Sequence, residues 1–101
     1  MKKLKPITPG EILFKEFMEP MGLTQNALGR ALHVSPRRIN EIIHGMRTIT
    51  ADTALRLAQY FRTTAQFWIN SQANYNLRKA EDLFGTKIRR LIKPCKWAIT
   101  A

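Results

Sequence analysis

With 101 residues, the chain can bury one hydrophobic core but not two, so we expect a single domain over residues 1–101. Hydrophobic residues make up 45% and charged residues 24%, which excludes a disordered chain, and no apolar run approaches the roughly 18 residues that a membrane span needs. Seventeen Lys and Arg against seven Asp and Glu leave a formal charge of +10, which suits either a polyanionic partner or a merely solubilising surface.

Cysteine and histidine are sparse, with one Cys (Cys95) and two scattered His. A single cysteine excludes an intramolecular disulfide, and none of these residues has metal-site spacing, so we expect no metal and no cofactor. No apolar signal-peptide core follows the basic start of the chain, which favours a cytoplasmic protein.

The first helix is marked at both ends. Thr8, followed by Pro and with Glu11 three residues on, is typical of a capped helix start. Pro20 disfavours helical geometry in the residue before it, and Gly22 completes the stop. The sequence therefore predicts a helix over about 9–19.

Two short helices follow. Thr24 caps one that runs to about Leu32, and Ser35 followed by Pro36 starts another that Gly45 ends. Only three residues, 33–35, separate them, and so short a turn forces the helices to cross steeply. This is the helix-turn-helix arrangement, which we place at about 24–44.

Two residues of this turn have special roles. Gly29 falls where the two helices meet, and the absent side chain permits close approach. His33 falls where the turn wants a positive φ, which Gly adopts most easily and His tolerates.

The helix after Ser35 has an inner and an outer face. At 100° per residue Ile39, Ile42 and Ile43 face inward, whereas Arg37 and Glu41 lie opposite. Such a helix can enter the major groove, where Arg pairs with guanine and Asn with adenine, while Glu accepts from cytosine or holds a neighbouring Arg. Flanking side chains could hold phosphate. The predicted DNA-contacting residues are Gln25, Ser35, Arg37, Arg38, Asn40, Glu41, Arg47 and Thr48.

Two more helices complete the chain. Thr50 caps the fourth, whose expected core positions are Ala54, Leu55, Leu57, Ala58 and Phe61. Thr63 and Gln66 suggest a capping box for a long fifth helix, which Gly85 could end. Its apolar stripe comprises Ile69, Ala73, Leu77, Ala80, Phe84, Ile88 and Leu91. The basic tail at about 86–101 has five Lys or Arg and no acid, and we expect frayed or alternative structure there.

The fifth helix is also the candidate dimer interface. One helix-turn-helix unit covers only a few base pairs, so specific binding calls for a two-fold dimer. The stripe is longer than a four-helix body consumes. Phe67, Ile69 and Ala73 could close the monomer's own core, and the residues further along are expected at the interface: Tyr75, Leu77, Ala80 and Phe84.

The order of short blocks resembles the HigA family of antitoxins, which belong to the lambda-repressor-like helix-turn-helix class. The blocks, between residues 8 and 80, are Pro9-Gly10-Glu11-Ile12-Leu13, Gly22-Leu23-Thr24-Gln25, residues 36–42, residues 49–58, Phe67-Trp68-Ile69-Asn70 and Tyr75-Asn76-Leu77. The resemblance implies an all-α, five-helix fold with a long C-terminal helix, a homodimer, and repression of its own operon on double-stranded operator DNA. It further implies neutralisation of a HigB-type toxin, a ribosome-dependent messenger-RNA endonuclease. The chain has Gly29 and His33 where the family commonly has Ala and Gly.

Other functions are compatible with parts of this pattern. A stand-alone repressor would lack the toxin partner, and a protein-interaction module would use its basic face for RNA or an acidic protein. An enzyme with a small-molecule substrate is not expected, because the acids lie at helix caps and on solvated faces, and no nucleophile–base pair is apparent.

Overall fold

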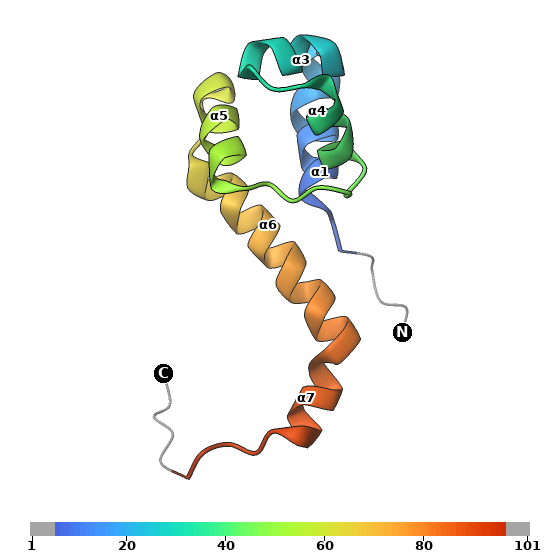
Figure 1. Cartoon of the computed structure of the whole chain (residues 1–101), viewed down its shortest axis with the longest axis vertical. Coiled ribbons are helices and arrows are strands. Elements are labelled where there is room, and N and C mark those ends of the chain that lie inside the picture. The colour runs from blue at the N-terminus through green and yellow to red at the C-terminus, as the bar shows by residue number, and fades with distance from the viewer. Residues whose placement is uncertain (1–5, 97–101) are drawn as a thin grey trace.

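The computed structural model describes residues 6–96, and over that range the chain is helical without a strand (Figure 1). α1, η1 and α2 form one continuous helix, as do α6, η2 and α7, so the described chain has the five helices expected of an all-α fold. The η segments are π-helical turns. The bounds are α1 (Pro9–Ile12), η1 (Leu13–Met18), α2 (Glu19–Met21), α3 (Gln25–Leu32), α4 (Pro36–Ile43), α5 (Ala51–Phe61), α6 (Ala65–Ala80), η2 (Glu81–Gly85) and α7 (Thr86–Leu91).

The first helix runs past the predicted end at residue 19 and stops after Met21. The reason is the π-helical segment before Pro20, in which the Glu19 amide donates to the Phe14 carbonyl five residues back. A proline in an ordinary α-helix clashes with the carbonyl four residues earlier, and the wider turn relieves that clash. Gly22, with φ 65°, then ends the helix in the left-handed conformation, as predicted.

The core lies where the first four helices meet the start of α6. Its buried apolar side chains are Leu13, Met18, Leu28, Leu32, Ile39, Ile42, Ile49, Ala54, Leu57 and Trp68. The prediction that Leu55 belongs to this core is wrong, because Leu55 is 64% exposed on the outer face of α5. The other expected α5 positions, Ala58 and Phe61, are half-buried against the core.

Trp68 anchors the fifth helix in the core. Its indole is fully buried, is surrounded by the rings of Phe17, Phe61 and Phe67, and donates from Nε1 to Thr63 Oγ1 at 2.8 Å. A buried indole N–H needs such an acceptor. Thr63 is therefore not the helix cap that the sequence suggested.

The cap of α6 is Thr64, whose hydroxyl accepts from the Phe67 amide at 3.1 Å. Of the three residues expected to close the monomer's core, Ile69 packs against it, Phe67 is partly exposed beside Trp68, and Ala73 is exposed.

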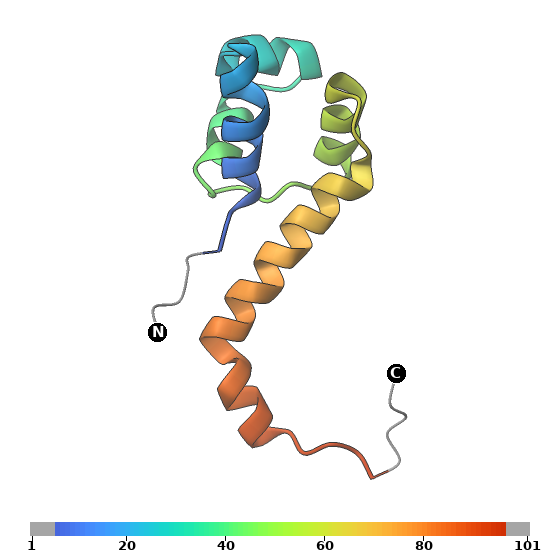
Figure 2. The same ribbon diagram turned by 180° about the vertical axis from the view of Figure 1, so that it is seen from behind.

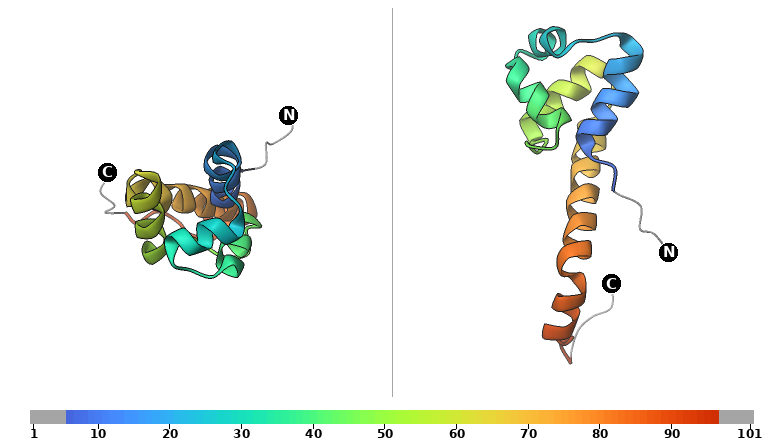
Figure 3. Two further views of the ribbon diagram at one scale, coloured as in Figure 1. Left: turned by 90° about the horizontal axis from the view of Figure 1, so that it is seen from above. Right: turned by 90° about the vertical axis from the view of Figure 1, so that its right-hand side faces the viewer.

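Beyond the body, the fifth helix continues as a long projecting arm (Figures 2 and 3), and the molecule measures 54 × 31 × 20 Å. Gly85 does not end it. The π-helical turn carries the chain on into α7, and Glu81 bridges that turn by accepting from Arg89 at 2.5 Å. The prediction of frayed or alternative structure in the basic tail is thus wrong for residues 86–91, which are helical. Residues 97–101 of that tail lie outside the described range.

Gly10→Ala should destabilise the fold while Gly85→Ala should not. A Cβ at Gly10 would overlap the backbone carbonyl oxygens of Ile42 and Ile43 at the end of α4, whereas at Gly85 it would meet only the flexible end of Glu81. We expect Gly10→Ala to lower the free energy of unfolding by about 2–3 kcal/mol or more, and Gly85→Ala to change it by about 1 kcal/mol at most. Urea denaturation followed by circular dichroism measures both, and equal stability of the two variants would contradict the close packing of α1 on α4.

Candidate nucleic-acid interface

The turn between α3 and α4 has the predicted geometry. His33 ends α3 in the left-handed conformation, with φ 58° and ψ 43°. A Cβ on Gly29 would lie 2.9 Å from the Val34 carbonyl oxygen and 3.2 Å from the Pro36 nitrogen, so a side chain here would require the backbone of this crossing to shift. The Val34 amide donates to the Gly29 carbonyl at 2.9 Å, which closes the turn. Both special positions are thereby confirmed.

Ser35 and α4 form the outer edge of this turn. The Ser35 hydroxyl accepts from the Arg38 amide at 3.1 Å and so caps α4. Ile39 and Ile42 are buried and Ile43 is half-buried, as the angular analysis predicts. Arg37, on the opposite side, has a side chain 86% exposed, so the outer face of α4 is open to a ligand.

Glu41 joins two arginines on this outer face. Arg37 Nε donates to Glu41 Oε2 at 3.3 Å, and Arg47 Nε donates to Glu41 Oε1 at 2.9 Å. The hydrogen bond from Arg47, together with the charges of Arg47 and Arg37, holds the pKa of Glu41 below its ordinary value against partial desolvation. The predicted contact with Arg37 is confirmed. The contact with Arg47 crosses the bend after α4 and was missed.

Asn40 and Gln25 are linked to each other. Asn40 Nδ2 donates to Gln25 Oε1 at 3.1 Å, which ties the middle of α4 to the first residue of α3. The Asn40 carbonyl also lies 2.8 Å from His44 Nδ1. The two amide side chains therefore form one polar unit on the helix-turn-helix surface, although the sequence analysis gave them separate roles.

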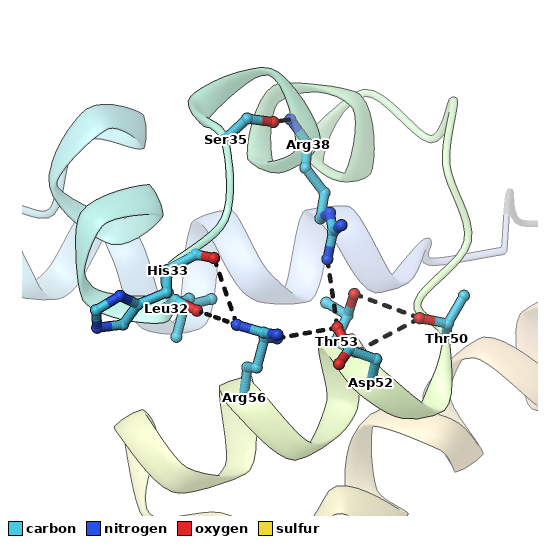
Figure 4. Close-up of polar contacts among 8 residues, drawn as sticks. All are labelled: Leu32, His33, Ser35, Arg38, Thr50, Asp52, Thr53 and Arg56. Atoms are coloured by element: carbon cyan, nitrogen blue, oxygen red, sulfur yellow. Dashed lines mark hydrogen bonds and ion pairs between the residues drawn. The ribbon is translucent and has the colours of Figure 1, made fainter.

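A second polar network lies behind Arg38 (Figure 4). Arg38 Nη1 donates to Asp52 Oδ2 at 3.4 Å, and Arg56 Nε donates to the same oxygen at 2.9 Å. Arg56 Nη1 also donates to the backbone carbonyls of Leu32 at 2.8 Å and His33 at 3.4 Å. The hydrogen bond from Arg56, with the charges of both arginines, lowers the pKa of Asp52. The sequence analysis gave Asp52 no role at this surface.

The loop that carries Arg47 and Thr48 is held from the fifth helix. The Ile49 amide donates to Gln72 Oε1 at 2.9 Å, and Gln72 Nε2 in turn donates to Asn76 Oδ1 at 2.9 Å. Thr48 and Arg47 remain exposed on that loop. The fifth helix thus contacts the same loop that carries two of the predicted DNA-contacting residues.

The predicted dimer residues lie along the projecting arm. Leu77 is 72% and Phe84 52% exposed, and Ala80 is exposed, whereas Tyr75 is half-buried with Lys79 Nζ 5.9 Å from its ring centre. Further exposed apolar side chains continue the arm at Leu83, Ile88, Leu91 and Ile92. Within residues 6–96 of a single copy, these apolar side chains are exposed.

The helix-turn-helix family matches residues 14–68, more than half of the chain. Virulence-associated protein I of Dichelobacter nodosus is 57% identical over 78% of this chain and 73% of its own length. Antitoxin HigA-1 of Vibrio cholerae is 36% identical over 91% of this chain and 86% of its own. The solved structure of Pseudomonas aeruginosa antitoxin HigA with the higBA promoter is 46% identical, with a TM-score of 0.86 over 88% of this chain and 97% of that one.

The chain belongs to the HigA family of helix-turn-helix antitoxins. Its overall fold agrees with that of the relative solved with promoter DNA. Among residues 6–96, this HigA-family chain has no helix long and apolar enough to cross a membrane.

The lowered pKa of Glu41 gives a direct test of the interface geometry. In an NMR titration, the Glu41 carboxyl should have its midpoint below the ordinary value of about 4.3, and Arg47→Gln should raise that midpoint more than Arg37→Gln does. Because the folded pKa is depressed, the contribution of this cluster to stability is present above the unfolded pKa and is lost as pH falls through the folded one. An unchanged midpoint in Arg47→Gln would contradict the Arg47 contact.

Proposed function

We propose that this chain is a sequence-specific DNA-binding antitoxin that represses its own operon. The observation that carries the proposal is the outer face of α4: Arg37 and Asn40 stand on a helix held by a tight helix-turn-helix turn, in a chain of charge +10. The promoter complex of the Pseudomonas aeruginosa relative supports it. A catalytic function is not part of the proposal.

The residues divide by position into base-reading and phosphate-holding groups. Arg37, whose side chain is 86% exposed, is proposed to pair with guanine, with Asn40 reading adenine beside it. Phosphate contacts are assigned to the periphery of α4, to the start of α3 and to the loop after α4, which are Gln25, Ser35, Arg38, Arg47 and Thr48. Glu41 fixes the positions of Arg37 and Arg47 by accepting a hydrogen bond from each, and it can also accept one from cytosine.

We further propose a HigB-type toxin as the protein partner. The Vibrio cholerae relative is named an antitoxin, which supports a toxin partner here. Co-expression with a HigB-type toxin, followed by affinity purification, tests this. Recovery of an inactive one-to-one or two-to-two complex is expected, whereas a chain that purifies alone and still represses would be a stand-alone repressor.

A homodimer is proposed as the DNA-binding unit. Two reading helices about one DNA turn apart give enough contacted base pairs for specific binding. The apolar side chains of the arm, above all Leu77 and Phe84, supply a surface for the second copy. Because the arm projects from the body, two copies can pair there without covering α4.

Arg37→Ala should relax specificity at one base position. Loss of a bidentate pair costs about 1–3 kcal/mol at that position, whereas Arg47→Ala, at the periphery, should weaken binding to all sequences alike. Competition binding over a set of operator variants measures both. If Arg37→Ala lost affinity equally for every variant, the base-reading role would be wrong.

Replacing Leu77 and Phe84 together with Glu should give a folded monomer that binds operator poorly. Both side chains are exposed in the single chain, so their replacement should not disturb the core. The matched control is Leu55→Glu, an equally exposed leucine on α5 that should stay dimeric. Sedimentation velocity with circular dichroism gives the outcome, and a double variant that remains dimeric places the interface elsewhere.

A further inference from the structure

The network around Asp52 connects α3, α4 and α5 (Figure 4). These helices support the reading face, which is the outer face of α4 with Arg37, Asn40 and Glu41. Arg38 belongs to α4, Asp52 and Arg56 belong to α5, and the carbonyls of Leu32 and His33 end α3. Five residues thus join α3, α4 and α5 through hydrogen bonds that involve two guanidinium groups and one carboxylate.

The several N–H donors of the Arg56 guanidinium allow it to bond to α3 and to Asp52 at the same time. The carbonyls at a helix C-terminus lack intrahelical partners, and a cation there is favourable. Arg56 satisfies those of Leu32 and His33 from Nη1 while Nε reaches Asp52. A lysine ammonium is a point donor and cannot span both ends of this arrangement with the same planar geometry.

Asp52 is placed between two arginines on a well-anchored helix. It lies in the first turn of α5, where a carboxylate is favoured by the helix dipole. The next turn of α5 is fixed by the buried Ala54 and Leu57. Asp52 therefore gives Arg38 an attachment point that does not move with α4 alone.

The adjacent arginines on α4 differ in exposure, although each is bonded to a carboxylate. The Arg37 side chain is 86% exposed, whereas that of Arg38 is 32% exposed and bonded to Asp52. A guanidinium has five N–H donors, so the bond to Asp52 leaves others for a phosphate oxygen.

We propose that Asp52 and Arg56 are positioning residues for DNA recognition, which fix α4 relative to α3 and α5 and aim Arg38 at the phosphate backbone. The inference rests on the proposed function, since it concerns how accurately the reading face is presented. A positioning role can be distinguished from a simple charge effect. Asp52 is an acid beside the proposed DNA surface, so its removal should by electrostatics alone strengthen binding to any duplex.

The test compares affinity for the operator with affinity for a scrambled duplex at one salt concentration. Asp52→Asn and Arg56→Lys should each lower the ratio of the two affinities about tenfold, as loss of a charge-assisted hydrogen bond would. Glu16→Gln makes the same charge change on the exposed face of η1, and Arg62→Lys makes the same substitution at the end of α5. Both controls should keep the ratio within about twofold of wild type.

A double-mutant cycle identifies the partner of Asp52. Arg38→Gln and Asp52→Asn should be coupled in operator binding, because either substitution breaks the same hydrogen bond. Circular dichroism establishes that each variant is folded. If Arg56→Lys unfolds, the positioning role is tested with Asp52→Asn, which keeps the shape of the side chain. Folded variants with the wild-type ratio and no coupling overturn the positioning role. Wild-type protein without any operator preference would instead refute the proposed function, and this inference with it.

Discussion

The steep crossing of α3 over the start of α4 is the constraint on which the reading face depends. Only residues 33–35 connect the two helices, and backbone packs directly on backbone at Gly29. His33 adopts the left-handed conformation, which costs a non-glycine residue on the order of 1 kcal/mol. Burial of Leu28, Leu32 and Ile39 on either side offsets that cost.

Once the crossing is set, the acidic residues organise the cations around it. The formal charge of +10 would draw the chain to any polyanion, but attraction alone does not orient a helix. Glu41 binds Arg37 and Arg47, and Asp52 binds Arg38 and Arg56. Each carboxylate reduces the charge locally and in exchange limits where the bound guanidinium groups can go. Orientation of this kind favours discrimination between sequences over affinity for all of them.

The sequence was most informative where a local rule applies. The caps at Thr8, Thr24, Ser35 and Thr50 each accept the expected backbone amide, and the left-handed residue at 33 lies where the turn required it. These features depend on neighbours within four residues, so periodicity and cap chemistry suffice to predict them.

The errors arose where a distant contact or an irregular turn decides the outcome. The π-helical turns at η1 and η2 let the first and fifth helices continue past Pro20 and Gly85. The periodicity of apolar residues does not predict such turns. Thr63, which was predicted to cap α6, instead accepts a hydrogen bond from the buried indole of Trp68. Leu55 is apolar but lies on the outer side of α5, because the core needs only one face of that helix.

Several contacts of the candidate site could not be predicted for the same reason. Asp52 meets Arg38 across 14 positions, Arg56 meets Leu32 across 24, and Ile49 meets Gln72 across 23. Such pairs exist only after the helices have packed. The residue types were visible in the sequence, whereas their partners were not.

The central claim is that α4 reads DNA as part of a two-fold unit. Hydroxyl-radical footprinting on the promoter of the chain's own operon tests it most directly. The account predicts two protected segments on one face of the duplex, with centres about 10 base pairs apart. Protection that is uniform along any duplex, or absent at all concentrations that saturate the duplex in a mobility shift, would contradict it.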